Sequence, residues 1–263
     1  MTTATFRLYV HDDLTDDVTA RHGPKSEALR LARELMALVA RDSGRVTVLT
    51  LEQQLRALAA RGPFPPFPLA VGIGGAGERV ARHVHARTGW FPRIARVDAT
   101  REEDGGGGYR VVSCGAQSLA AQLEVARDCL AVALVDDTAF SGITVETLLD
   151  RLPVQSRPSA HVICLRGVGE TLARLRARCP VTAGFEAPGR MLSEVSFINA
   201  SGLVRRGSIR RAGRPPLAFF ERPEWIAEWF PDVAPAVVEA CRALNEILDG
   251  PPMTGPHPAR EVT

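Results

Sequence analysis

Lysine, paired cysteines and long apolar runs are scarce or absent in this sequence. Lys25 is the single lysine, so chemistry that requires a lysine has one candidate. The 5 cysteines are an odd number and include no Cys-x-x-Cys pair, which argues against a disulfide framework and a zinc knuckle. No segment has the roughly 18 uninterrupted apolar residues of a membrane helix, and residues 1–10 lack the basic start and apolar stretch of a leader. We therefore expect a cytoplasmic protein in a reducing compartment, with no membrane partner.

A basic excess is also missing, because 32 Lys+Arg face 30 Asp+Glu and leave a formal net charge of +2. Neutralising a nucleic-acid backbone requires basic residues in excess on one face. We therefore expect no nucleic-acid partner. The 263 residues, 45% of them hydrophobic, are enough for one large α/β unit with appendages.

Strands and helices alternate regularly from Leu69 onward. The pattern predicts strands at 69–73, 93–98, 130–135 and 161–165, and helices at 78–87, 118–128 and 144–151. Such alternation is typical of a doubly wound, mainly parallel α/β sheet with helices on both faces. Ligands bind such sheets at the carboxyl ends of the strands.

We divide the chain into four parts. Residues 1–68 are expected to hold a short strand, a polar flap at 11–21, a helix at 26–41, a strand at 45–51 and a helix at 52–60. The α/β core spans 69–180. A looser C-terminal region with a final helix spans 181–250, and a disordered tail spans 251–263.

The most informative segment is VALVDDTAFSGIT at 132–144, an apolar strand that ends in two carboxylates and a loop before a helix. Backbone N–H groups of the loop and the positive end of the helix suit a phosphate dianion. The Ser141 and Thr144 hydroxyls add donors, and Gly142 permits close approach of the main chain. Asp136 and Asp137 can accept hydrogen bonds from vicinal ribose hydroxyls and help to hold a hydrated Mg²⁺.

This segment resembles the motif that binds 5-phosphoribosyl 1-diphosphate (PRPP) in the type I phosphoribosyltransferases. In that motif a hydrophobic strand is followed by two acidic residues, three variable positions, Ser or Thr, Gly, any residue, and Ser or Thr. Every anchor position matches here. The resemblance implies that Asp136 and Asp137 act on the ribose and hold Mg²⁺ indirectly, through PRPP and water. It implies 5′-phosphate contacts from Ala139, Phe140, Ser141, Gly142, Ile143 and Thr144.

Thr138, Ala139 and Phe140 depart from the residues usual in the family. Members that use 6-oxopurines have an Asp at the position of Phe140, so the resemblance disfavours that class of acceptor. Asp137→Asn is expected to reduce turnover more than folding.

A glycine-rich loop follows the first core strand. The resemblance places the pyrophosphate loop there, with the residues Gly72, Ile73, Gly74, Gly75, Ala76, Gly77 and Arg79. The same residues satisfy G-x-G-x-x-G through Gly72, Gly74 and Gly77, and Asp98 closes the next strand as a dinucleotide fingerprint requires. A dinucleotide-dependent oxidoreductase is therefore an alternative, but it leaves the 136–144 loop without a role.

Residues 101–109 contain three acidic residues and four consecutive glycines, and we expect a mobile loop there. The resemblance places a flexible catalytic loop at this point, which closes over PRPP and excludes water. It implies that Arg101 binds pyrophosphate and that Glu102, or else Glu103 or Asp104, takes a proton from the acceptor.

The resemblance also implies a variable hood, built from the N-terminal and C-terminal segments, that sets acceptor specificity. A basic cluster in the C-terminal segment comprises Arg205, Arg206, Arg210, Arg211 and Arg214. We interpret it as a solvated hairpin in preference to a site for an anionic acceptor or RNA. Aromatic residues between 219 and 230 are interpreted as core in preference to a stacking wall.

We therefore predict a PRPP-dependent phosphoribosyltransferase with Mg²⁺ as cofactor. It transfers the 5-phosphoribosyl group to an unidentified small-molecule acceptor and releases pyrophosphate. The sequence does not decide whether the protein forms a homodimer. A second alternative is a regulator on the same fold that senses PRPP or a nucleotide without catalysis.

Overall fold

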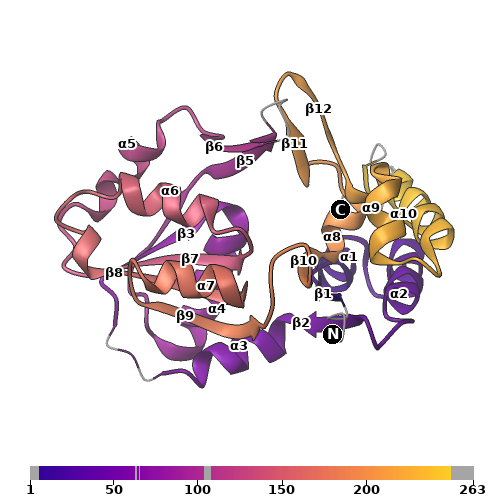
Figure 1. The fold of residues 1–263 in the computed structure, drawn as a ribbon, viewed down its shortest axis with the longest axis horizontal. Coiled ribbons are helices and arrows are strands. Elements are labelled where there is room, and N and C mark those ends of the chain that lie inside the picture. The colour runs from indigo at the N-terminus through magenta and orange to yellow at the C-terminus, as the bar shows by residue number, and fades with distance from the viewer. Residues whose placement is uncertain (1–5, 63, 65, 104–107, 250–263) are drawn as a thin grey trace, which may run out of the picture.

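The computed structural model describes residues 6–62, 64, 66–103 and 108–249, and Figure 1 shows their arrangement. A five-stranded parallel sheet forms the core, in the order β4-β3-β7-β8-β9. Its strands are β3 (Leu69–Ile73), β4 (Ile94–Val97), β7 (Val132–Ala139), β8 (Ala160–Val168) and β9 (Val181–Ala187). The strand order reverses between β3 and β7, and such a reversal is where open α/β sheets bind ligands.

Helices cover both faces of the core sheet. One face carries α3 (Leu51–Ala59) and α4 (Gly74–Thr88), and the other carries α5 (Leu119–Leu123), α6 (Ile143–Arg151) and α7 (Gly169–Arg176). Val132 and Leu134 of β7 pack on the α6 side, whereas Ala133 and Val135 pack on the α4 side. Burial on both sides accounts for the unbroken apolar run in this strand. The predicted doubly wound, mainly parallel α/β fold is confirmed.

The two ends of the chain form a second unit, named the hood here, which comprises residues 6–50 and 195–249. It contains a parallel sheet in the order β10-β1-β2. Its strands and helices are β1 (Arg7–Asp12), α1 (Leu14–His22), α2 (Glu27–Val39), β2 (Val46–Thr50), β10 (Val195–Asn199), α8 (Ala200–Val204), α9 (Pro223–Trp229) and α10 (Ala234–Asp249). One hydrophobic cluster joins Leu8 and Leu35 to Phe230 and Cys241, so the two ends of the chain pack together. The bounds differ from the expected division at 68 and 180, because α3 packs on the core sheet and β9 is one of its strands.

A small sheet in the order β12-β11-β5-β6 connects hood and core. Its strands are β5 (Ala99–Glu103), β6 (Tyr109–Ser113), β11 (Ile209–Arg211) and β12 (Arg214–Leu217). Figure 1 shows the β11–β12 hairpin extending from the hood toward β5, where Arg211 pairs with Glu103. Short 3₁₀ turns complete the described elements, namely η1 (Glu124–Ala126), η2 (Arg157–Ser159) and η3 (Phe219–Glu221).

Several local predictions were wrong. The polar segment at 11–21 is mostly helix α1, because Leu14 and Val18, four residues apart, are both buried in the hood. Residues 101–103 and 109, which we expected in a mobile loop, belong to the paired strands β5 and β6, whereas residues 104–107 of that expected loop lie outside the described residues. Helix α4 begins at Gly74, so the glycines that we expected in a loop form its first turn.

The strand β7 is longer than predicted and runs through the acidic pair to Ala139, because Asp136, Thr138 and Ala139 continue the ladder with β8. Aromatic residues at 219–230 pack in the hood, where Phe220 and Phe230 are buried. The predicted disordered tail at 251–263 lies outside the described residues. Among the helices that the structure describes, none combines the length and apolar character needed to cross a bilayer.

Candidate functional site

A cavity of about 350 Å³, named the signature cavity here, lies at the carboxyl ends of β3 and β7. It contains residues from both loops that the sequence singled out. The glycine-rich segment contributes Ile73, Gly74, Gly75 and Ala76, and the 132–144 segment contributes Asp136 to Gly142 and Thr144. Gly72, Gly77, Arg79, Glu102 and Ile143, which the sequence also proposed, are not part of its lining.

Contacts from α7 shape the loop between β7 and α6. The Thr171 hydroxyl donates to the Phe140 carbonyl at 2.5 Å, and the Arg174 guanidinium donates to the Ser141 carbonyl. Gly142 has a φ of +77°, and a Cβ atom there would lie 3.0 Å from both Arg174 Nη2 and Thr171 Cγ2. A side chain at this position would therefore disturb both the backbone and its support. Helix α7 therefore supports the backbone of this loop at Phe140 and Ser141.

The first turn of α4 forms the opposite wall. Gly74 has a φ of +60°, a conformation that favours glycine. Gly72 and Gly77 permit close packing, because a Cβ atom would lie 2.4 Å from the Glu78 backbone at the first and 2.2 Å from the Val135 carbonyl oxygen at the second. Only the middle of the glycine-rich segment therefore faces the cavity. The helix N-terminus there suits an anion.

Three arginines line the same cavity from three different elements. Arg96 belongs to β4, Arg101 to β5 and Arg210 to β11 of the hood. Arg96 pairs with Asp98 at 2.5 Å, and Arg210 Nη1 lies 3.5 Å from Cys114 Sγ. Sequence reasoning found Arg101 but missed Arg96 in this role, although its place in the strand before Asp98 was a usable signal. It assigned Arg210 to a solvated hairpin, since only the pairing of β11 with β5 brings that residue to the cavity.

The adjacent carboxylates Asp136 and Asp137 have different surroundings. Asp136 Oδ1 accepts a hydrogen bond from the Asp137 backbone N–H at 2.8 Å. Burial, followed by the neighbouring Asp137 charge, raises the pKa of Asp136 well above its ordinary value. Asp137 Oδ2 accepts hydrogen bonds from Arg166 Nη2 and Asn199 Nδ2, each at 3.1 Å. Burial alone would raise the pKa of Asp137, but the Arg166 charge and the Asn199 amide outweigh burial and lower it.

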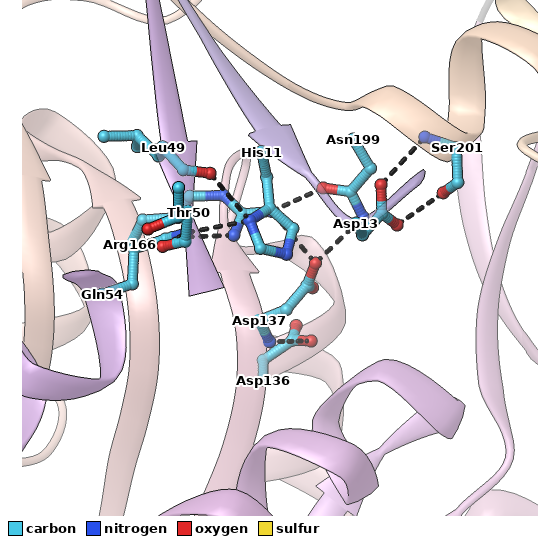
Figure 2. Close-up of polar contacts among 10 residues, drawn as sticks. All are labelled: His11, Asp13, Leu49, Thr50, Gln54, Asp136, Asp137, Arg166, Asn199 and Ser201. Atoms are coloured by element: carbon cyan, nitrogen blue, oxygen red, sulfur yellow. Dashed lines mark hydrogen bonds and ion pairs between the residues drawn. The ribbon is translucent and has the colours of Figure 1, made fainter. Parts of the chain in front are cut away.

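Arg166 is the centre of a buried polar network that joins the core to the hood (Figure 2). Its side chain is 0% exposed, and besides Asp137 it donates to Gln54 Oε1 at 2.9 Å and to Asn199 Oδ1 at 2.5 Å. Gln54 Nε2 in turn contacts His11 Nδ1 at 2.8 Å and donates to the Thr50 carbonyl at 3.0 Å. Asp137 is therefore linked directly to Asn199 of hood strand β10. Through Arg166 and Gln54 it is also linked to His11 of hood strand β1.

The residues of the signature cavity fit a phosphorylated sugar and its metal ion. Thr138 belongs to the cavity lining, and its Oγ1 is buried without a hydrogen-bond partner in the described structure. Mg²⁺ prefers oxygen ligands and commonly binds through one or two carboxylates, water and substrate phosphates. No cluster of three or more His, Cys, Asp or Glu residues suited to a metal exists within the described ranges. Asp136 and Asp137 fit an indirect role, with the diphosphate supplying the other ligands.

No protein-family model matches the sequence, and no curated protein matches it significantly. Among solved structures, a hypothetical protein from Neisseria gonorrhoeae with bound ppGpp is 20% identical, with a TM-score of 0.42, over 57% of this chain and 85% of that chain. A purine phosphoribosyltransferase from Pyrococcus horikoshii is 15% identical, with a TM-score of 0.36, over 56% and 87%. An adenine phosphoribosyltransferase from Thermoanaerobacter pseudethanolicus is 14% identical, with a TM-score of 0.34, over 57% and 84%. These similarities concern the path of the chain alone.

Proposed function

We propose that this protein binds PRPP with Mg²⁺ in the signature cavity, transfers the 5-phosphoribosyl group to an acceptor and releases pyrophosphate. One observation carries the proposal. Two backbone segments suited to phosphate, far apart in the sequence, line a single cavity with Arg96, Arg101 and Arg210. The paired sites match a molecule with a phosphate at one end and a diphosphate at the other.

In this proposal the loop at 139–144 holds the 5′-phosphate, and the ribose lies over Asp136. The bond between C1 and the pyrophosphate oxygen breaks, and its electron pair leaves with pyrophosphate. The N-terminus of α4 and the three arginines stabilise the negative charge that develops there, while Asp136 stabilises positive charge on the ribose. A lone pair of the acceptor forms the new bond to C1. When bound, Mg²⁺ supplies charge neutralisation for the diphosphate.

The proton of the acceptor needs a base, and Glu102 remains the proposed residue. Glu102 Oε2 accepts from Arg110 Nη2 at 2.8 Å and does not line the signature cavity. A role in catalysis therefore requires the β5–β6 hairpin to move toward the ribose.

A non-catalytic PRPP sensor is the second candidate, and the network around Asp137 favours it. A carboxylate that already accepts hydrogen bonds from Arg166 and Asn199 has less capacity left for ribose hydroxyls. The oxidoreductase alternative has less support, because Gly72 and Gly77 face packed backbone and not the cavity.

Calorimetric titration of PRPP, with and without Mg²⁺, tests the proposal. We expect binding that depends on Mg²⁺, is at least tenfold weaker in Ser141→Ala, and is unchanged in Asp150→Asn, a control on the exposed side of α6. Pyrophosphate release with added acceptors separates transferase from sensor. A melting-temperature increase with a dinucleotide but none with PRPP would replace this proposal by the oxidoreductase.

A further inference from the structure

A second cavity of about 420 Å³, named the hood cavity here, lies between the hood and α4. Asp137 and Ala76 line both this cavity and the signature cavity, so the two adjoin at the acidic pair. The hood contributes residues of β1, α1 and α8, together with Asn199, and α4 contributes Arg79, Val80 and His83. A molecule held here would therefore lie beside the ribose of PRPP, on the hood side.

The charges of the hood cavity are unbalanced toward the negative. Of its arginines, Arg21 and Arg205 both pair with Asp17, at 2.8 Å and 2.5 Å. Asp12 Oδ1 accepts only from the Thr15 backbone N–H, and Asp13 accepts from the Ser201 backbone N–H and hydroxyl. Three carboxylates of this lining have no ion pair within the described part of the chain, namely Asp12, Asp13 and Asp16. Among its arginines, Arg79 alone has no ion pair with a described residue.

The His11 ring lies in the wall of the hood cavity, and the network in Figure 2 determines which of its nitrogens carries the proton. Arg166 can only donate, so the Gln54 oxygen faces Arg166 and the Gln54 amide nitrogen faces His11. His11 Nδ1 is closer to Gln54 Nε2, at 2.8 Å, than to the Leu49 carbonyl, at 3.3 Å, and therefore accepts. The ring proton is then on Nε2.

His11 is only 6% exposed and lines the hood cavity, and Nε2 has no partner within the described residues. This donor is a second sign of a ligand, independent of the carboxylates. Burial, followed by the Arg166 charge, lowers the pKa of His11, so the ring is neutral at neutral pH. The ring therefore offers a ligand a hydrogen bond without a positive charge.

We propose, resting on the phosphoribosyltransferase function above, that the hood cavity is the acceptor subsite and selects a small protonated amine that also has a carbonyl oxygen. The ammonium group lies against Asp12 and Asp13, and the carbonyl accepts from His11 Nε2–H. Apolar side chains of Leu51, Val80 and Leu165 cover the remainder of the molecule. The negative excess disfavours an anionic acceptor, because like charges in a confined site repel.

The transfer balances with such an acceptor. A proton moves from the ammonium group to a hood carboxylate, and the free nitrogen lone pair forms the bond to C1. The nitrogen then carries a positive charge, and Glu102 takes this second proton to give the neutral product. The electrons of the broken C1–O bond leave with pyrophosphate. The acceptor thus enters as a cation, which the cavity holds, and reacts as a neutral amine, which is the nucleophile.

Ligand-observed NMR in the presence of PRPP and Mg²⁺ tests the selectivity with two probes of similar size. Phenylalaninamide is a cation with a carbonyl oxygen, and N-acetylphenylalanine is an anion. We expect phenylalaninamide to bind at least tenfold more tightly than the anion. We expect this preference to be lost in the double variant Asp12→Asn/Asp16→Asn and kept in Asp150→Asn, with circular dichroism verifying the fold of each variant.

Equal or tighter binding of N-acetylphenylalanine, or an unchanged preference in the folded double variant, would overturn the proposal. PRPP binding is measured in the same samples by calorimetry. If PRPP binds and neither probe does, the amine subsite is wrong and the proposed function stands. If phenylalaninamide binds and PRPP does not, the proposed function is wrong and the acceptor role of the hood cavity fails with it.

Discussion

At the scale of single residues, the adjacent carboxylates Asp136 and Asp137 have opposite environments. Asp137 is paired with a buried cation, whereas Asp136 has a backbone N–H as its partner and a like charge beside it. The same residue type therefore has a raised pKa at one position and a lowered pKa at the next. We expect the two to differ in substitution experiments.

Asp136→Asn should weaken PRPP binding without lowering stability. The folded-state pKa of Asp136 is raised, so its ionisation opposes folding once the pH exceeds the ordinary carboxyl value of 3.8. The variant should gain stability relative to the parent as the pH rises from about 4 toward the folded-state pKa. Urea unfolding at pH 4, 5.5 and 7 measures this difference, and a constant difference across that range contradicts it. Calorimetry should show PRPP affinity reduced by about tenfold, or ~1.4 kcal/mol.

Arg166→Met should destabilise the fold by about 3–5 kcal/mol, because it leaves the buried Asp137 carboxylate without its cation. Arg166→Met/Asp137→Asn should recover part of this loss, since the unpaired charge is removed. Chemical denaturation of the two variants provides the comparison. A double variant no more stable than the single one would show that the ion pair is not the cause. The pair also gives Asp137→Asn a folding cost, in addition to the loss of turnover that the sequence predicted.

At the scale of elements, strand β3 and helix α4 use glycine in two separate ways. Gly77 lets α4 pack directly against the β7 backbone at Val135, whereas Gly75 faces the signature cavity. A glycine-rich segment is thus partly a packing device and partly a ligand surface. Adding one methyl group at each position, by a Gly→Ala substitution, separates the packing role from the ligand-binding role.

Gly77→Ala should destabilise the protein by about 1–3 kcal/mol, because the added Cβ atom would lie 2.2 Å from the Val135 carbonyl oxygen. Gly75→Ala serves as the matched variant, since its Cβ atom meets only the tips of Arg79 and Arg96, at 3.6 Å and 3.7 Å. We expect Gly75→Ala to keep its melting temperature and to lose PRPP affinity. The assignment fails if thermal denaturation finds the larger loss in Gly75→Ala.

At the scale of the whole molecule, the hood completes a site that the core alone would leave open. The pairing of β11 with β5 brings Arg210 to the signature cavity, and Asn199 of β10 holds Asp137 from the same side. Residues from the C-terminal part of the chain thus contribute to a site built around the end of β7. We therefore expect PRPP binding to depend on the packing of the hood against the core.

Arg210→Ala should weaken PRPP binding about five- to tenfold and leave the melting temperature unchanged, because the side chain lines the cavity on a surface hairpin. Arg214→Ala, an exposed arginine of the same hairpin, is the control. Titrations at low and high salt should show the difference between the two variants shrinking as salt screens the charge. Equal affinity of both variants would remove Arg210 from the site.

Local pattern was sufficient for the core elements but not for every boundary. Unbroken apolar runs identified β3, β7 and β8, since short runs of this kind between helices are typical of parallel strands covered on both faces. The pattern failed at α1, whose buried residues Leu14 and Val18 stand among acidic ones. It also failed at β5 and β6, because a glycine run does not reveal that the flanking residues pair.

The parallel core and the segments suited to phosphate follow from local sequence, because strand burial, loop chemistry and helix starts are encoded by residues close together in the chain. Three features depend on the folded arrangement: Arg166 pairs with Asp137, Arg210 lines the signature cavity, and an acidic cavity adjoins it under the hood. Each of these depends on residues from distant strands meeting at one sheet edge. Pairing between distant strands is set by packing of the whole molecule and leaves no periodic trace in the sequence.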